Sequence, residues 1–427
     1  MAEAAGFAEI RRFEADLMQC AKCGFCTFWC PVYQEEHVES SVARGKNMMV
    51  RALLAGELEY TREFADRLNK CTLCMTCTAN CPARANIPNI VVAARADGFK
   101  ARGIGFPYNV VYRWLLPRRR LFGNIIRLAS WFQGVFMPRT RGTIRHLPFF
   151  LSALGRGRQI PQIAPRFLRQ MVPVVNSPPD GVDARMRVGY FAGCMTDFVF
   201  PELGKKIISF LNKNGVEVVV PGQQVCCGAP VFLGAGDFDT GRRLADTNVR
   251  AFSEFDYVIL NCATCASAMK EYGKFLADTA ERRQVYAAFA AKVTEITEFL
   301  VDVLKLPASA YRAVPGVKGK KVTWHDPCHL SRHLAITGPP RQILKAIPDI
   351  EFVEMPEAGR CCGMAGAFSI HFYELSKQIA DKKMASIAAA GADVVVTGCP
   401  GCQVQLVDTA IRHKKPVEVM HIMELLE

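Results

Sequence analysis

The sequence predicts an α+β protein, in which an all-helical front module is followed by a duplicated α/β unit. Three observations support this prediction. Two short cysteine runs lie in the first 81 residues and flank a segment with helical periodicity. The second half of the chain alternates strand-like with helix-like stretches, which is typical of α/β units. In that half a pattern of five cysteines occurs twice in the same order.

Length and composition limit the class of protein. The chain has 427 residues, half of them hydrophobic, so it is long enough for several globular domains. We expect four parts: a ferredoxin-type domain at 1–97, a connector at 98–184, and two cysteine-rich domains at 185–312 and 313–427. Its first residues are charged and lack the apolar segment of a secretion signal. All eighteen cysteines fall within motifs. In a reducing compartment, clustered cysteines indicate metal binding rather than disulfides.

The two front runs share one spacing, Cys-x-x-Cys-x-x-Cys-x-x-x-Cys-Pro. It is that of bacterial ferredoxins with two cubane [4Fe–4S] clusters, in which the fourth thiolate ligates the other cluster. Structural zinc is the alternative, but zinc sites close with four ligands and do not need this double run. The resemblance implies two metal sites: Cys20, Cys23, Cys26 with Cys81, and Cys71, Cys74, Cys77 with Cys30.

The segment between the two runs is longer than in a small ferredoxin. We expect helices over 44–57 and 60–69, which makes the module similar to those of respiratory iron–sulfur subunits. Residues 98–184 then form a connector. Between Phe99 and Pro179 there are fourteen Lys or Arg and no Asp or Glu, whereas the rest of the chain carries a net charge of −1.

The connector contains a stretch, Leu121–Met137, with helical periodicity. Its apolar side carries Leu121, Ile125, Leu128, Phe132 and Val135. The stretch is too short and too polar to span a membrane. It is flanked by Arg118–Arg120 and by Arg139, Arg141 and Arg145. It could bind an anionic membrane surface, form a docking surface for a partner subunit, or serve as an internal connector. The sequence shows no known nucleic-acid-binding fold, so this charge does not indicate nucleic-acid binding.

From Met186 onward, strands and helices alternate twice, with a boundary expected over 306–319. The expected strands are 188–191, 216–220 and 257–260, then 321–324, 351–354, 394–397 and a final strand, 417–421. The expected helices are 202–212, 239–255 and 265–275, then 340–346, 373–390 and 403–412. The cysteines follow the strands, at the edge where an open sheet presents its crevice.

The two rear sets of five cysteines have nearly equal spacing. A lone cysteine precedes an adjacent pair by 32 or 33 residues, and a Cys-x-x-Cys follows the pair after 35 or 37. Adjacent cysteines do not suit an ordinary cube, so an opened cluster is expected, and the glycine after each pair lets the backbone turn close to the metal. Zinc sites and a redox disulfide are the alternatives. The sets are Cys194, Cys226, Cys227, Cys262, Cys265 and Cys328, Cys361, Cys362, Cys399, Cys402.

This repeated Cys…Cys-Cys-Gly…Cys-x-x-Cys pattern resembles the cysteine-rich domain of the B-type and D-type subunits of heterodisulfide reductase. The resemblance implies a noncubane [4Fe–4S] cluster in each complete set, so one or two of them. The whole layout is similar to the D-type subunits, and to the iron–sulfur subunits of glycolate or lactate oxidase and anaerobic glycerol-3-phosphate dehydrogenase. The complete Cys-x-x-Cys pairs favour the heterodisulfide reductases or the related subunits of membrane-bound redox complexes. The C-terminal segment favours the hydroxy-acid oxidases, so the substrate stays open.

Two functions follow from this resemblance. The first is an electron-transfer subunit of an oxidoreductase that relays electrons between a flavoprotein dehydrogenase, or another redox subunit, and a membrane quinone or a disulfide. No Gly-x-Gly-x-x-Gly follows a strand, so we expect no flavin on this chain. We expect a cytoplasmic protein, peripheral at the inner face of the membrane. The second is a catalytic subunit that cleaves a disulfide, with these residues at its site: Cys328, Cys361, Cys362, Cys399, Cys402 and His329.

Three histidine and aspartate residues flank Cys328. His325, Asp326 and His329 all lie within three residues of it. A histidine beside the cluster could donate a proton during disulfide reduction. Alternatively, it hydrogen-bonds a cluster sulfur and tunes the reduction potential. A purely structural zinc protein is the third class of function that these cysteines allow.

Overall fold

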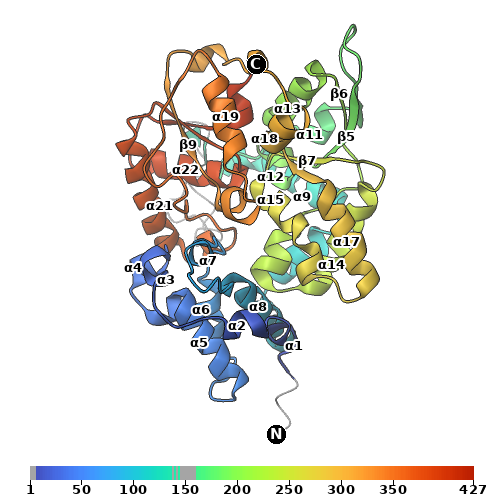
Figure 1. Ribbon diagram of the computed structural model, residues 1–427. Helices are drawn as coiled ribbons and strands as arrows, with labels where there is room; N and C mark the ends of the chain where they lie inside the picture. The colour runs from blue at the N-terminus through green and yellow to red at the C-terminus, as the bar shows by residue number, and fades with distance from the viewer. Residues whose placement is uncertain (1–5, 137–138, 141–142, 145–159) are drawn as a thin grey trace.

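The computed structural model describes residues 6–136, 139–140, 143–144 and 160–427. It is a mixture of helix and sheet, as predicted, and two α/β units stand side by side above the front module (Figure 1). The front module is blue, the first unit green to yellow and the second orange to red. The last residues of the predicted 121–137 helix and most of the arginines after it lie outside the described residues or have undescribed side chains.

The described elements from Ala8 to Arg102 are all helical. The long helix α8 has Pro88 in its first turn, where a missing N–H costs nothing, and Gly103 after its end at a φ of +68°. It continues beyond residue 97, where we had expected a domain boundary. Helices α5 and α6 agree with the two predicted between the cysteine runs. The elements are α1 (Ala8–Arg11), α2 (Glu14–Met18), α3 (Cys26–Trp29), α4 (Tyr33–Glu36), η1 (Glu39–Ser41), α5 (Ala43–Leu54), α6 (Arg62–Asn69), α7 (Thr76–Ala79) and α8 (Ile87–Arg102).

Each rear unit has its own sheet. The first has the strand order β4-β6-β5-β7-β8, with β4 antiparallel, and the second is all parallel with the order β10-β9-β11-β12. The four parallel strands of each sheet therefore repeat in the same spatial order, which supports the duplication. Sequence reasoning missed β4 and β8. The strands are β4 (Val175–Asn176), β5 (Met186–Tyr190), β6 (Val216–Val219), β7 (Val258–Leu260), β8 (Val293–Glu295), β9 (Lys321–His325), β10 (Glu351–Phe352), β11 (Val394–Thr397) and β12 (Glu418–His421).

Helices connect and cover these strands. The predicted helices are present with ends shifted by a few residues, except that the predicted helix 265–275 is divided into α15 and α16. In the first unit they are α11 (Leu168–Met171), α12 (Cys194–Phe198), α13 (Pro201–Lys213), η4 (Ala229–Ala235), α14 (Phe238–Ala251), α15 (Ala263–Lys270), α16 (Tyr272–Phe275), α17 (Ala280–Lys292), α18 (Ile296–Glu298) and η5 (Phe299–Val303). After the short turns η6 (Ala308–Ala310) and η7 (Pro315–Val317), the second unit has η8 (His329–His333), α19 (Gly338–Ala346), α20 (Phe368–His371), α21 (Tyr373–Ala389), α22 (Pro400–Arg412) and α23 (Ile422–Leu425).

The connector contains η2 (Val110–Leu115), α9 (Arg119–Phe136) and three two-residue strands, β1 (Arg139–Thr140), β2 (Thr143–Ile144) and β3 (Ile160–Pro161). Helix α9 turns its apolar side outward. Leu128 is 53% exposed and Trp131 67% exposed, whereas Gln133 on the opposite side is buried. The Gln133 amide donates to the carbonyl of Ile163 at 2.7 Å and accepts from its N–H at 3.0 Å. The helix is thus attached in part through polar contacts, together with the packing of Phe122 on Phe198.

The front module contacts both rear units. Toward the first unit, Arg95 of α8 donates to the carbonyl of Leu233 at 3.0 Å. Toward the second, Lys382 of α21 forms an ion pair with Glu35 at 2.8 Å. Contacts of this kind place the front cysteine loops beneath the second unit.

Candidate functional site

The eight front cysteines line two neighbouring cavities. One is lined by Cys30, Cys71, Cys74 and Cys77, and the other by Cys20, Cys23, Cys26 and Cys81, with Cys77 at their common wall. Each contains about 410 or 400 Å³ of space free of protein atoms, the solvent at the mouth included. Each cavity is therefore lined by the first three cysteines of one run and by the last cysteine of the other.

Both front loops bend through left-handed residues at matching positions. Lys22 and Gly24 have φ values of +58° and +82°, and Leu73 and Met75 have φ values of +54° and +56°. Left-handed backbone is uncommon outside glycine, and its repetition here turns three successive cysteines toward one cavity. The short helices α3 and α7 begin where the loops end.

In the rear units the cysteines follow the carboxyl ends of the parallel strands, as predicted. The Cys-x-x-Cys pairs begin helices, since Cys262 is the residue before α15 and Cys399 the residue before α22. Backbone N–H groups at a helix N-terminus stabilise a thiolate. Each Cys-Cys-Gly turn has its glycine in the left-handed region, at φ +83° for Gly228 and +86° for Gly363. A Cβ on Gly363 would lie 2.5 Å from the carbonyl oxygen of Ser376.

The first rear set (Cys194, Cys226, Cys227, Cys262 and Cys265) is gathered at one place. Cys227 is in hydrogen-bond contact with both Cys226 and Cys265, and Cys265 also contacts Cys262. Two hydrogen bonds hold the pKa of Cys227 well below its usual range. The same hydrogen bonds, followed by burial, raise the pKa of Cys226 and of Cys265.

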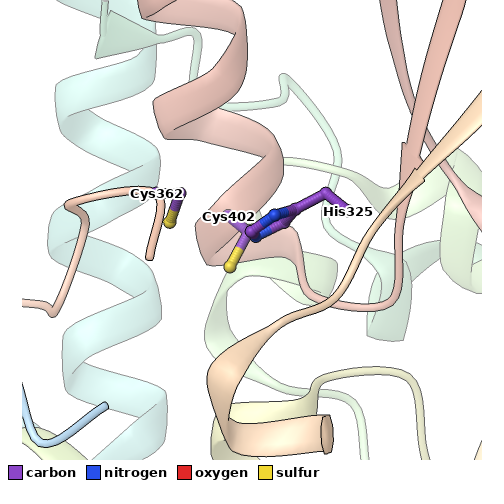
Figure 2. A group of neighbouring side chains, drawn as sticks. All are labelled: His325, Cys362 and Cys402. Atoms are coloured by element: carbon purple, nitrogen blue, oxygen red, sulfur yellow. The ribbon is translucent and has the colours of Figure 1, made fainter. Parts of the chain in front are cut away.

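The second rear set (Cys328, Cys361, Cys362, Cys399 and Cys402) is gathered in the same way. Cys361 contacts Cys328 and Cys362, and Cys402 contacts Cys362 and Cys399. In addition, a ring nitrogen of His325 and the sulfurs of Cys362 and Cys402 all lie within 4.8 Å of one another (Figure 2).

His325 is buried, and both of its ring nitrogens lack a hydrogen-bond partner in the described part of the chain. Burial, followed by the nearby Lys383 charge, lowers its pKa to about 3, so the ring is neutral and can act as a hydrogen-bond donor or as a ligand. His329, which we also expect at the site, meets the hydroxyl of Ser267 at 2.7 Å and stacks on His333.

The sets of thiols adjoin one another. The sulfurs of Cys262 and Cys399 are 3.9 Å apart, which joins the first rear set to the second. Cys74 of the front module packs in one buried cluster with Cys361 of the second set. The loop of Cys74 is also held there, because His333 contacts the carbonyl of Leu73 at 2.8 Å. Sequence reasoning did not predict these contacts.

The donor set fits iron–sulfur clusters. Sulfurs in mutual contact and out of water cannot all become thiolates unless a cation shares the space. The front module also buries two cations, Lys46 and Arg95, which form no ion pair among the described residues. Arg95 donates to the carbonyl of Cys71 at 2.8 Å. Positive charge at this place would balance the negative charge of a thiolate-bound cluster.

Comparison with protein families agrees with this arrangement. Residues 16–85 match the model of a 4Fe-4S dicluster domain. Residues 188–270 and 322–407 each match the model of a cysteine-rich domain. The molecule is thus an iron–sulfur protein that joins a dicluster domain to two cysteine-rich domains.

The chain is also similar to curated proteins. It is 30% identical to a probable glycolate oxidase iron-sulfur subunit of Bacillus subtilis, over 93% of this chain and 89% of that protein. It is 33% identical to lactate utilization protein A of Shouchella clausii, over 56% of this chain and 98% of that protein. A subunit of the fumarate reductase (CoM/CoB) of Methanothermobacter marburgensis is 32% identical over 64% of this chain and 50% of its own length. The chain therefore belongs to the family of the glycolate oxidase iron-sulfur subunit.

Proposed function

We propose that this protein is the electron-transfer subunit of an oxidoreductase that links a flavoprotein dehydrogenase to a membrane quinone or to a disulfide acceptor. The observation that carries the proposal is the continuity of the thiol sets. They run from the front module through the second rear set to the first, with contacts at Cys74 and Cys361 and at Cys262 and Cys399. Relatives named as subunits of glycolate oxidase and fumarate reductase support a role in a complex.

We assign four sites to the cysteines. Two hold cubane clusters in the front module, Cys20, Cys23, Cys26 with Cys81 and Cys71, Cys74, Cys77 with Cys30. The other two are the rear sets, each of which holds a noncubane cluster. Such clusters supply one-electron oxidation and reduction. The chain itself buries most of the rear cysteines and keeps neighbouring sites in contact.

The order of the sites differs from their order along the chain. The front set with Cys74 adjoins the second rear set, although the first rear set comes earlier in the sequence. We infer that electrons enter or leave the rear half through the second set.

Iron content tests the assignment. Four [4Fe–4S] clusters require about sixteen irons per chain, whereas a front pair alone requires about eight. An anaerobically prepared sample with about eight irons would refute the rear sites. Inertness of the isolated chain until a flavoprotein is added would support the electron-transfer role.

A second candidate is direct disulfide cleavage at the rear sets. It is favoured by the contact between Cys262 and Cys399, because a disulfide bound there would face two one-electron donors at once. The candidate catalytic residues are those of the second set with His329. Reduction of a disulfide by the isolated chain with reduced viologen would support this candidate over the electron-transfer subunit.

We further propose that the outward face of α9 binds an anionic membrane surface at the inner face of the cytoplasmic membrane. No described helix is both long and apolar enough to cross a bilayer. The face carries Leu121, Ile125, Leu128 and Trp131, all exposed, and the surrounding segment from Phe99 to Pro179 has no acidic residue. An exposed apolar face in a basic segment is typical of interfacial helices.

Vesicle sedimentation tests this face. The chain should bind vesicles rich in phosphatidylglycerol and not vesicles of phosphatidylcholine alone, and Leu128→Glu should abolish the binding. Val285→Glu is the control, because Val285 is 50% exposed but lies on α17. Absence of binding by the unmodified chain would instead favour a partner subunit as the occupant of this face.

A further inference from the structure

The two rear sites differ at one buried position of the helices that cover their Cys-Cys-Gly turns. Asn248 of α14 comes 22 residues after Cys226, and Lys383 of α21 comes 22 residues after Cys361. Both side chains are fully buried, at 0% exposure. The duplication therefore places an amide beside the first turn and an ammonium group beside the second.

Asn248 supports its turn with neutral hydrogen bonds. Its side-chain oxygen accepts from the N–H of Val225 at 2.9 Å, and its side-chain nitrogen donates to the carbonyl of Cys226 at 3.1 Å. In this site burial raises the pKa of Cys194, and the charge of Arg119 acts in the opposite direction. Arg119 is itself paired with Asp197 at 2.6 Å.

Lys383 supports the second turn with a charge. Its Nζ donates to the carbonyls of Glu357 and Ala358 at 3.0 and 2.8 Å, in the segment that leads to Cys361. Among the described residues no carboxylate pairs with it. The nearby carboxylate of Asp326 is held by two bonds from Arg341 at 3.0 and 2.8 Å.

The charge of Lys383 acts on the cysteines of the second site, mainly Cys362 and Cys402. Burial lowers the pKa of Lys383 to about 8, so the group is still mainly protonated at neutral pH. A buried charge is weakly screened by salt, and its effect on neighbouring groups is large.

We propose that Lys383 raises the reduction potential of the second rear site above that of the first, which makes the second site the preferred electron acceptor in the rear half. The inference rests on the proposed function, because it requires a cluster at each rear site. When a cluster takes one electron from the front module, its negative charge grows by one. A fixed cation nearby stabilises that reduced form more than the oxidised form.

Two neutral variants, Lys383→Gln and Lys383→Met, test the role of the charge. Gln keeps a hydrogen-bond donor and Met does not. In anaerobic potentiometric titrations followed by EPR, both should shift one rear signal to more negative potential. We expect about a tenfold or larger fall in its ratio of reduced to oxidised cluster at a fixed potential, as for one charge at an effective dielectric constant near 20. A Cys362→Ser variant identifies that signal by its loss.

The two variants separate charge from support of the loop. If Gln behaves as the unmodified chain and only Met shifts the signal, the hydrogen bonds rather than the charge matter, and the proposal is wrong. Unchanged potentials in both variants at full iron content would also overturn it. A chain with only about eight irons would instead refute the proposed function, so the two failures are distinguishable.

If neither Lys383 variant binds its full iron content, the reciprocal substitution Asn248→Lys still tests the proposal. Asn248→Lys introduces the cation at the first site. It should shift the other rear signal to more positive potential and leave the signal of the second site in place. An unchanged first-site potential in an iron-replete Asn248→Lys protein would overturn the proposal.

Discussion

At the scale of single residues, His325 distinguishes the second rear site from the first. It stands three residues before Cys328, and the residue three before Cys194 is Phe191. Both ring nitrogens of His325 lack a hydrogen-bond partner among the described residues, and the ring lies beside the sulfurs of Cys362 and Cys402. A group bound to these sulfurs could therefore form a hydrogen bond with the ring. At this position the duplication thus has a phenylalanine in the first unit and a histidine in the second.

We predict that His325→Phe changes the EPR spectrum of one rear cluster while the front signals stay as they are. The reason is that cluster electronic structure responds to hydrogen bonds and ligands at its sulfurs. His371→Phe is the matched control, because His371 is an exposed histidine of the second unit whose ring packs on Tyr108 of the connector. If the spectra of His325→Phe and the unmodified chain coincide, the ring has no contact with a cluster.

Another residue, Glu295, makes stability depend on pH. It is fully buried at the end of β8, where one carboxylate oxygen accepts from the N–H of Thr297 at 2.8 Å. Its other oxygen has no partner in the described part of the chain. Burial raises the pKa of Glu295 to about 7, despite the hydrogen bonds from Thr297.

The folded chain therefore holds this proton more tightly than the unfolded chain. Stability from this group is fully present below its unfolded pKa of 4.5, falls as the pH rises to about 7, and is constant above. We predict that the free energy of unfolding of Glu295→Gln does not show this fall with pH. Relative to the unmodified chain, its free energy of unfolding should therefore increase by up to about 3 kcal/mol between pH 4.5 and pH 8. Urea unfolding of both proteins measures it. A difference independent of pH would contradict the assignment.

At the scale of elements, the junction of α8 with η4 holds the front module to the first unit. Gly236 ends η4 at a φ of +80°, and a Cβ there would lie 2.4 Å from the backbone of Arg95. The close approach allows Arg95 to reach the carbonyl of Leu233. Glycine is therefore required both for the backbone conformation and for the space.

We predict that Gly236→Ala destabilises the protein by about 2–4 kcal/mol, from left-handed strain and overpacking together. Thermal unfolding and proteolysis between the modules would reveal it. Gly222→Ala is the control, because a Cβ at Gly222 would meet nothing within 4 Å. Equal stability of the two variants would show that the junction can adjust.

Elements with a strong local signal were predictable from the sequence. Helix 373–390 and strand 394–397 occur as α21 and β11 with nearly the same ends, because periodicity and β-branched runs act locally. Strand β8 was missed, since its three residues, Val293–Glu295, are strand only through pairing with β7. The outward apolar side of α9 was also outside the reach of periodicity, which shows that a helix has two sides and not which one is covered.

At the scale of the whole molecule, the second rear set lies between the front module and the first rear set. This order gives a prediction for a pair of variants. Loss of the second site in Cys362→Ser should slow the reduction of the first rear site when the front clusters are reduced rapidly. Loss of the first site in Cys227→Ser should leave the reduction of the second unaffected. Freeze-quench EPR measures both rates.

The outcome that contradicts this order is equal reduction of the first site in the presence and absence of the second. Such a result would mean that the front module reaches the first site directly. Loss of the front signals in Cys362→Ser would instead show that the ligand sets are divided differently from our assignment.

By itself the sequence predicted which residues are the sulfur donors, how they divide into four sets, and that the rear half is a duplication. It could do so because cysteine spacing and the alternation of strands and helices are properties of short stretches of chain. Only the tertiary structure decided that Cys74 lies near Cys361 and that Cys262 lies near Cys399. It also decided that Lys383 and His325 lie near Cys362 and Cys402 of the second rear set. Contacts between residues so distant in the chain depend on how whole sheets and helices pack, and no local pattern records that packing.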